Sequence, residues 1–252
     1  SCAEGETLLE ALQSLRLDLF TLYQEEDNEQ AKKEMPAPTT LAQDLRSGTA
    51  KVHAIAERSA FIKHYMRGEL NREIYGQFLI SLYHIYIALE EVLDQHANNE
   101  RLRTIYFPDK LRRAPEIEKD LEFYIGPTWR EKAQQVPQST QDYVDRLYEL
   151  SRTNPDLLVA HSYTRYLGDL SGGQILAKRT RKFLELPADK GTAFYDFDAI
   201  DNCNEFKEDF RAALNEIPVD ADTKAAIVEE ANNAFRLNVG VFEAHEHLLQ
   251  QG

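Results

Sequence analysis

Hydrophobic side chains recur every three or four residues along most of this 252-residue chain, the spacing that puts them on one face of an α-helix. The first stripe in the main part of the chain consists of Leu41, Leu45, Val52, Ile55 and Ala56. Thr40 and Gln43 stand at its start in the pattern of a capping box, in which each side chain bonds the other residue's backbone N–H. We therefore expect a helix from residue 41 to about Glu57.

Helical signals continue to the end of the chain. A long stripe between Asn71 and His96 carries Phe78, Leu82, Ile85, Leu89 and Leu93. Further helices are predicted over residues 115–125, 139–152, 155–186, 202–216 and 222–249. No segment shows the period-two alternation of a strand, and no internal repeat is visible. We therefore predict an all-α fold in which residues 41–252 form a single multi-helix domain.

The first forty residues differ from the rest. Their apolar stripe is narrow and consists of Leu8, Leu12, Leu15, Leu19 and Leu22. An acidic stretch and the stiff sequence Pro36-Ala37-Pro38 follow it. We interpret residues 1–40 as an acidic extension with an amphipathic helix, which either docks on the main body or pairs with a partner helix. Docking is favoured, because the stripe is short for a coiled coil.

Three glycines fall inside one of the predicted helices, in the sequence GDLSGGQ. They are Gly168, Gly172 and Gly173. Each glycine in a helix interior costs about 1 kcal/mol relative to alanine, so three in close succession mark a conflict of the kind found at functional sites. Gly168 and Gly172 share a face and leave bare backbone beside the carboxylate of Asp169. A close helix crossing and the close approach of a ligand explain this pattern equally well.

Composition narrows the possible functions. With 29 basic and 43 acidic residues, the net charge is −14, which disfavours non-specific binding of nucleic acid. No apolar run is long enough to span a membrane. Cys2 and Cys203 are far apart in the sequence, so the chain has no disulfide framework, and neither belongs to a CxxCH attachment motif.

Seven histidines are candidate metal ligands. Glu57 follows His53 by one helical turn, where its carboxylate could hold the second ring nitrogen of a metal-bound imidazole. The alternative is an ordinary polar residue beside a core stripe. His245 and His247 are two positions apart, and we interpret them as a solvated helix end. The absence of ExxH and HExxH disfavours a di-iron bundle and a zinc protease.

The string VAHSYTRYLGDLSGGQ, residues 159–174, resembles the haem oxygenases, and the resemblance extends from about Leu41 to about Leu249. This motif is long and ungapped, and therefore far more specific than a lone glycine pattern. The resemblance implies a helical domain in which haem lies between a proximal helix and a kinked distal helix. It also implies cleavage of haem to biliverdin, carbon monoxide and ferrous iron, using O2 and electrons from an NADPH-dependent reductase or a ferredoxin.

The resemblance also implies how haem is held. The segment KVHAIAE matches the proximal helix of the family, so His53 is expected to ligate the iron and Glu57 to support it. Expected partners of the haem propionates are Arg46, Lys207 and Arg211, which by themselves would be solvated surface charges. Many relatives have lysine where this chain has Arg46. The position of His161 is not that of the ligand, so we assign His161 to packing or hydrogen bonding.

The remaining assignments concern the distal side and the haem edge. Gly168, Gly172 and Gly173 are expected to let the distal helix lie close over the haem and direct oxygen towards one meso carbon. Tyr86, Tyr163 and Arg165 are expected in a distal hydrogen-bond network, and Asp169 is expected to organise the water that delivers protons. Phe235 is expected at the haem edge, with Asn238 among the polar contacts nearby. On spacing alone these residues would be ordinary core and surface positions.

Two other functions stay open at this point. A haem-binding or haem-sensing protein that does not degrade haem would keep every motif, and only turnover separates it from an oxygenase. A thiaminase-like enzyme on a similar helical fold would need a nucleophilic cysteine, for which Cys203 is the candidate without a supporting pattern.

The sequence does not name the electron donor. Lys178, Arg179, Arg181 and Lys182 form a basic run on this acidic chain, and it either docks an acidic donor protein or is a solvated helix face. The solvated face is favoured. We expect a cytoplasmic or otherwise soluble intracellular protein, and a membrane-associated one if the full-length protein has a C-terminal tail.

Overall fold

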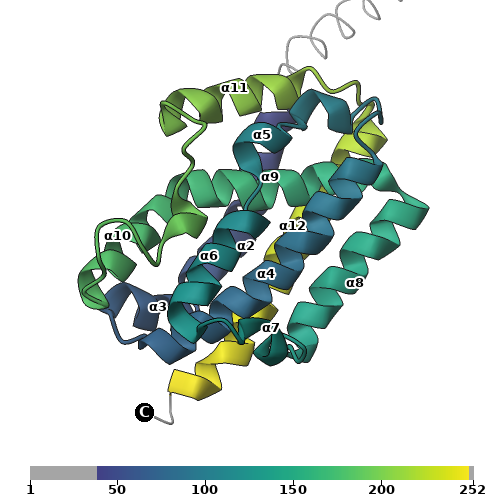
Figure 1. Cartoon of the computed structure of the whole chain (residues 1–252). Coiled ribbons are helices and arrows are strands. Elements are labelled where there is room, and N and C mark those ends of the chain that lie inside the picture. The colour runs from purple at the N-terminus through teal and green to yellow at the C-terminus, as the bar shows by residue number, and fades with distance from the viewer. Residues whose placement is uncertain (1–38, 250–252) are drawn as a thin grey trace, which may run out of the picture. The chain divides into compact units, whose positions relative to one another are not determined.

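The computed structural model describes residues 39–249, and every regular element in this range is a helix (Figure 1). The all-α prediction is confirmed, because the residues between the helices form only turns, bends and irregular connections. A compact unit begins at Thr40. The amphipathic helix predicted near the N-terminus lies outside the described residues.

Eleven α-helices and a π-helical turn make up most of the described range. In chain order the elements are α2 (Leu41–Glu57), α3 (Ala60–Arg67), α4 (Arg72–Gln95), α5 (Pro108–Leu111), α6 (Ala114–Ile125), α7 (Trp129–Lys132), α8 (Gln138–Thr153), α9 (Leu158–Gly168), the π-helical turn η3 (Asp169–Gly173), α10 (Gln174–Phe183), α11 (Cys203–Asn215) and α12 (Ala221–Leu249). Short 3₁₀ turns are η1 (Leu102–Ile105), η2 (Pro155–Leu157) and η4 (Ala193–Tyr195).

The helices begin where polar capping residues stand in the sequence. The capping box before α2 is confirmed: Thr40 Oγ1 accepts the backbone N–H of Gln43 at 3.3 Å, and Gln43 Oε1 accepts that of Thr40 at 3.0 Å. The Asn71 side chain accepts the backbone N–H of Ile74 at the start of α4, and Asn202 caps α11. Such side chains satisfy backbone donors that have no partner within the helix.

Two expectations about the apolar pattern need correction. The helix expected over residues 155–186 is divided into η2, α9, η3 and α10, and α10 ends at Phe183. Ile55, expected in the buried stripe of α2, has 53% of its surface exposed. The buried face of α2 passes through Leu45, Val52 and Ala56, and position 55 lies beyond the edge of that face.

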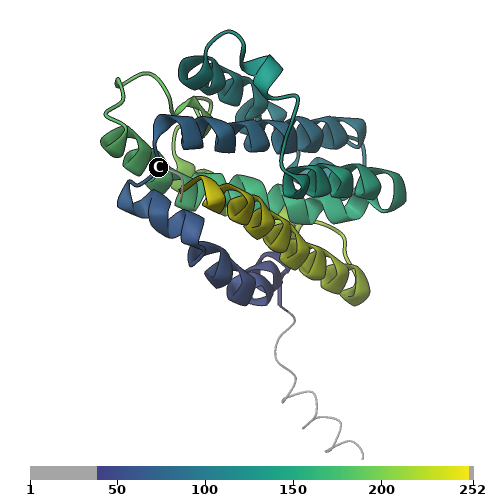
Figure 2. The same cartoon turned by 90° about the horizontal axis from the view of Figure 1, so that it is seen from below.

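The helices pack in a way that places α9 near the middle of the molecule. On one side α4 lies between α6 and α8, and on the other α12 packs along α2 and crosses α9 and α8 (Figures 1 and 2). One continuous core of buried residues joins these helices. Helix α12 therefore contacts both α2, which carries His53, and α9, which leads into the glycine-bearing segment.

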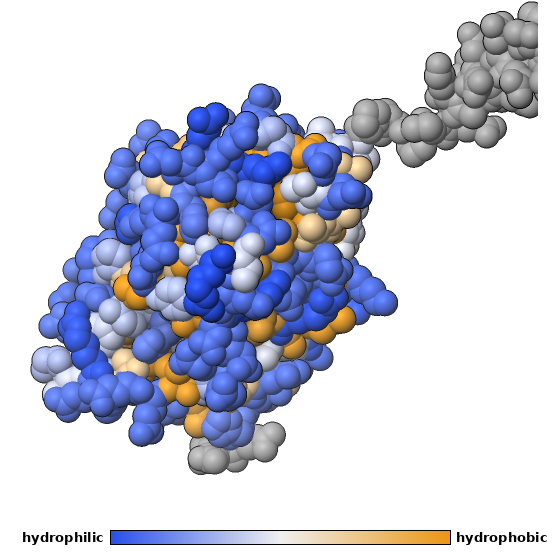
Figure 3. Space-filling model, turned by 90° about the vertical axis from the view of Figure 1, so that its right-hand side faces the viewer, coloured by the Kyte–Doolittle hydropathy of each residue, from blue (hydrophilic) through white to orange (hydrophobic). Residues whose placement is uncertain are grey.

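The surface is largely polar. Apolar residues form only small scattered groups on the face drawn in Figure 3. The large hydrophobic side chains that are exposed in the described range are Ile55, Ile87, Ile175 and Phe183. Within residues 39–249, none of the helices combines the length and the apolar character that crossing a membrane requires.

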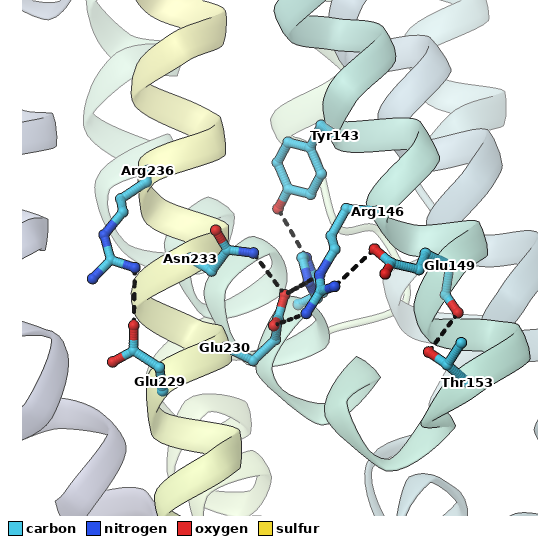
Figure 4. Close-up of polar contacts among 9 residues, drawn as sticks. Tyr143, Arg146, Glu149, Thr153, Glu229, Glu230, Asn233 and Arg236 are labelled. Carbon is cyan, nitrogen blue, oxygen red and sulfur yellow. Dashed lines mark hydrogen bonds and ion pairs between the residues drawn. The ribbon is translucent and has the colours of Figure 1, made fainter.

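A buried polar cluster ties α8, α9 and α12 together (Figure 4). Glu230 on α12 accepts hydrogen bonds from Arg146 on α8 at 2.5 and 3.1 Å, from Asn233 at 3.1 Å and from His161 on α9 at 2.9 Å. The other ring nitrogen of His161 lies 3.4 Å from the Tyr143 hydroxyl. The assignment of His161 to hydrogen bonding is confirmed, and its partner could not be predicted from the sequence, because Glu230 lies 69 positions further along the chain.

The charges in this cluster compensate one another. Burial alone would raise the pKa of Glu230, but hydrogen bonds from His161 and Arg146 lower it to about 2. Burial lowers the pKa of His161, so at neutral pH the ring is uncharged. The ring then donates from Nε2 to Glu230 and accepts from Tyr143 at Nδ1.

His245 is a further correction, because the structure buries it. Only 2% of its surface is exposed, its Nδ1 lies 2.8 Å from the Val241 carbonyl oxygen, and its ring meets Phe78 edge to face. His247 is exposed, as expected. The sequence could not separate the two because this end of α12 packs against α3 and α4.

We predict that Glu230→Ala destabilises the protein by about 3 kcal/mol, because it leaves Arg146 and His161 without their partner. Urea unfolding at neutral pH measures this. The matched control is Glu229→Ala, which removes the neighbouring carboxylate from an exposed pair with Arg236 (3.0 Å; Figure 4) and should cost less than about 1 kcal/mol. Equal losses in the two variants would contradict the prediction.

The same prediction has a pH dependence. Because the pKa of Glu230 is lowered in the folded protein, its contribution to stability is complete above the ordinary value of 4.5 and is lost as pH falls towards 2. The stability difference between wild type and Glu230→Gln should therefore shrink on acidification below pH 4.5.

Candidate functional site

The glycine-bearing segment leaves α-helical geometry at the point where the sequence places its conflict. The first helical part, α9, ends at Gly168, and residues 169–173 form the π-helical turn η3 before α10 begins. A π turn fits one extra residue into a helix and occurs often at functional sites. The predicted bend is therefore present as a local widening of the helix.

The three glycines have different surroundings. A Cβ atom added at Gly168 or Gly172 would meet no neighbouring atom within 4 Å, so both positions face open space. A Cβ at Gly173 would lie 3.2 Å from the ring of Tyr195. A tight helix crossing thus explains neither Gly168 nor Gly172, whereas the close approach of Tyr195 accounts for Gly173. The open face is available for a ligand.

A buried polar cluster lies directly behind this open face. The Tyr86 hydroxyl, from α4, donates to Oδ2 of Asp169. Arg165, one turn earlier on α9, donates from Nε to the Tyr86 oxygen at 3.1 Å and from Nη1 to Asn238 of α12 at 2.7 Å. Its Nη2 lies 4.0 Å from Asp169 Oδ1. Three helices therefore position the one carboxylate of the glycine segment.

The environment of Asp169 shifts its ionisation. Burial raises the pKa of this carboxyl group to about 6, although the Arg165 charge and the Tyr86 hydrogen bond oppose the shift. Burial also raises the pKa of Tyr86 well above its ordinary value. A carboxyl group with a pKa close to neutral can both hold and release a proton under physiological conditions.

His53 is open to solvent on α2. Its side chain is 52% exposed, and its Nδ1 lies 3.7 Å from Oε2 of Glu57, which is 67% exposed. The ring of Phe235 on α12 meets it edge to face, with 5.4 Å between the ring centres. An accessible imidazole, oriented by an aromatic ring and followed by a carboxylate, fits a haem-iron ligand with its support.

Tyr163 lies with the cations and not in the cluster around Asp169. Its hydroxyl bonds Thr49 of α2, which links the distal helix to the helix of His53. Burial raises the pKa of Tyr163, while Thr49, Arg211 and Arg46 act in the opposite direction. Tyr163 has no hydrogen bond to Tyr86, Arg165 or Asp169 among the described residues, and its expected place in a distal network stays a prediction.

The cationic side of the site comes from α2 and α11. Arg46 is exposed, and Lys207 and Arg211 of α11 are half-buried. Arg211 pairs at 2.5 Å with Glu208, an exposed neighbour on its own helix. Helix α11 packs against both α2, which carries His53, and η3, the glycine-bearing turn.

Two contributors were missed at the sequence level. Gln174 donates to the backbone oxygens of Asp169 at 3.3 Å and Tyr195 at 2.8 Å, which holds the end of the π turn. Its place at the end of GDLSGGQ was a signal that could have singled it out. Thr49 left no such signal, because its partner Tyr163 is more than a hundred positions away.

The comparisons with known proteins agree with this geometry. The sequence model of the family described as heme oxygenase matches residues 39–244. Heme oxygenase 2 of Synechocystis is 46% identical over 215 residues, which is 84% of this chain and 85% of that protein. Heme oxygenase 1 of Rattus norvegicus is 42% identical over 86% of this chain and 77% of its own length.

Solved structures give the same result. The heme oxygenase-2 of Synechocystis in complex with heme and NO superposes with a TM-score of 0.82 at 45% identity, covering 84% of this chain and 88% of that one. The heme oxygenase of Leptospira interrogans superposes with a TM-score of 0.78 at 45% identity, covering 81% and 98%. On the family match, the identity and the shared helical fold together, the chain belongs to the haem oxygenase family.

Proposed function

We propose that haem binds between His53 on α2 and the open face of Gly168 and Gly172, and that Asp169 delivers protons there. The activity is that of a haem oxygenase, which cleaves haem to biliverdin, carbon monoxide and ferrous iron with O2 and electrons. We assign it to the helical unit from Leu41 onward. The observation that carries these roles is a buried carboxyl group, held by Tyr86 beside an open glycine face.

The proximal side would hold the iron. The exposed imidazole of His53 is free to bind, and Glu57 can bond its other ring nitrogen once it reorients from 3.7 Å. Phe235 fixes the plane of the ring by edge-to-face contact. When bound, haem supplies the iron that activates oxygen, and it is also the substrate that is consumed.

The cationic side would orient the substrate. Arg46, Lys207 and Arg211 present positive charge from two helices, which suits the two propionates of haem. Tyr163 adds a hydroxyl group between them. Fixing both propionates fixes the rotation of the ring, and so determines which meso carbon lies against the glycine face.

On the distal side, Asp169 would supply protons, and the glycines would leave space that larger side chains would fill. Gly168 and Gly172 leave room for the ring and for oxygen, because neither carries a side chain into the open face. Asp169 holds a proton at Oδ1 or passes it on, and Tyr86 and Arg165 fix the position of the carboxyl group. Asn238 holds Arg165 in place.

The electron donor would dock on α10. Spacings of three and four residues connect Gly172 to Ile175, Lys178, Arg179 and Lys182. These side chains therefore share one helix face with the open glycine position. Ile175 is 54% exposed, and Arg179 and Lys182 lie over the Phe183 ring. An acidic reductase or ferredoxin would find here a positive, partly apolar surface that continues from the haem face.

We predict that His53→Ala still binds haem through the rest of the pocket but loses the spectrum of histidine ligation, and that added imidazole restores it. Absorption of the ferrous CO complex is the measurement. His64→Ala, which changes an exposed histidine on α3, serves as the control and should keep the wild-type spectrum. A native spectrum in His53→Ala would show that the ligand assignment is wrong.

Charge removal in Lys207→Ala/Arg211→Ala should loosen the rotation of haem, so the product should become a mixture of biliverdin isomers. Chromatography of the products measures this. Lys178→Ala/Lys182→Ala removes the same charge from the donor surface. This control should raise the concentration of acidic donor needed for half-maximal rate and leave the isomer unchanged. A single isomer from the first variant would count against the propionate role.

Asp169→Ala should fold and bind haem, because alanine suits a helix better than aspartate and Asp169 contacts neither the iron nor the propionates in this arrangement. Biliverdin formation should nearly cease, and hydrogen peroxide should instead drive oxidation of added phenols. Asp169→Asn keeps part of the hydrogen bonding and should lose less. A purely structural role predicts a lower melting temperature with a normal biliverdin yield per bound haem, so both are measured on the same sample.

A further inference from the structure

Three tyrosines mark a line from the site to the surface. Tyr86 on α4 is completely buried, Tyr166 on α9 is 3% exposed, and Tyr106 after η1 is half-buried. The rings of Tyr86 and Tyr166 lie 6.1 Å apart, within the range of direct aromatic contact. Tyr166 and Tyr106 line one and the same surface cavity. The line starts at Asp169 and ends in solvent.

Two of these tyrosines donate to a carboxylate, and the third lines a cavity with one. Tyr86 donates to Asp169, and because Arg165 donates to the Tyr86 oxygen, the hydrogen of the phenol is directed to that carboxylate. Tyr106 donates to Asp94 at 2.6 Å. Tyr166 shares its cavity with Glu90, whose charge, together with burial, raises the pKa of the Tyr166 phenol.

This pairing matters for one-electron chemistry. A phenol that gives up an electron also loses its proton, so it is oxidised readily only where a base accepts that proton. The carboxylates of Asp169, Glu90 and Asp94 are such bases. Asp94, the carboxylate nearest the surface, is bonded by Arg112 at 2.6 Å. Although burial opposes the shift, hydrogen bonds from Arg112 and Tyr106 lower the pKa of Asp94, so Asp94 stays ionised.

A second set of tyrosines lacks this property. Tyr195 lies against Gly173, and its hydroxyl is 3.2 Å from that of Tyr65. Tyr65 in turn bonds the Thr180 hydroxyl at 2.6 Å. Hydroxyl groups are poor proton acceptors. This set packs the back of the π turn and offers no path for oxidation.

We propose that Tyr86, Tyr166 and Tyr106 form a relay that carries one-electron oxidising equivalents out of the haem pocket to the surface. The oxidant is hydrogen peroxide reacting at the haem-loaded site: each peroxide accepts two electrons through the relay and two protons from solvent, and becomes two molecules of water. At each tyrosine the electron moves inward, and the phenolic proton passes to the neighbouring carboxylate. A small phenolic reductant in solution then returns a hydrogen atom to Tyr106.

Such a relay would protect the site. Oxidising equivalents that do not lead to haem cleavage would leave through Tyr106 and would not damage the glycine segment or the proximal histidine. The inference rests on the proposed position of haem beside Asp169, and it adds a function for Tyr166 and Tyr106, which the haem site itself does not use.

The test is to treat the haem-loaded protein with hydrogen peroxide in the presence of a nitroso spin trap, and to locate the adduct by peptide mass spectrometry. Wild type should carry the adduct on Tyr106. Tyr166→Phe should lose it, with an unchanged Soret band, because only a hydroxyl group is removed. Tyr106→Phe should move the adduct inward to Tyr166. Electron paramagnetic resonance of frozen samples should show a tyrosyl signal in wild type.

Two controls make the result decisive. Tyr148→Phe removes a phenol that donates to Glu91 at 2.6 Å, just as Tyr106 donates to Asp94. Tyr148 lies on α8 and does not line the cavity. It should keep the adduct on Tyr106.

Haem-free protein treated with peroxide should carry no adduct. A Tyr106 adduct that persists in Tyr166→Phe, or equal labelling of Tyr148 and Tyr106, would overturn the relay. Haem uptake without any tyrosine adduct refutes the relay alone, whereas absence of haem uptake refutes the proposed site as well.

Discussion

The burial of Arg165 is the constraint on which the distal side of the site depends. A guanidinium group cannot lose its charge, so a buried one must be paired and hydrogen-bonded. Arg165 is 8% exposed, and its partners come from three helices: Tyr86 on α4, Asn238 on α12 and Asp169 at the start of the π turn. The need to satisfy this one charge holds α4, α9 and α12 in register and leaves the carboxyl group beside the open glycine face.

Two buried carboxyl groups show how the surroundings decide their roles. Glu230 receives hydrogen bonds from Arg146, His161 and Asn233, and its pKa falls to about 2, so it is a permanent anion that holds helices together. Asp169 has one close donor and a cation 4.0 Å away, and burial raises its pKa to about 6. The first group is stabilised beyond proton exchange, whereas the second remains able to exchange protons near neutral pH.

Asp169 belongs to the π turn η3, whose backbone meets two structural demands. Gly168 and Gly172 border open space, whereas the missing side chain of Gly173 lets the Tyr195 ring pack closely. One short segment thus meets both demands. One demand is an open face at Gly168 and Gly172, and the other is close packing against η4. Gln174 bonds backbone oxygens on both sides and fixes the turn. The cost of glycine in a helix is thus accepted where both a ligand face and a tight contact are needed.

The sequence by itself determined the helical class, the cap at Thr40 and the position of the glycine segment, because each depends on residues close together in the chain. Its motif also pointed to the family, and with it to His53 and Asp169. Only the tertiary structure decided that Tyr163 bonds Thr49, that His245 is buried, and that Glu230 pairs with Arg146 and His161. Those facts depend on contacts between helices that are distant in sequence, where spacing along one helix carries no information about the partner.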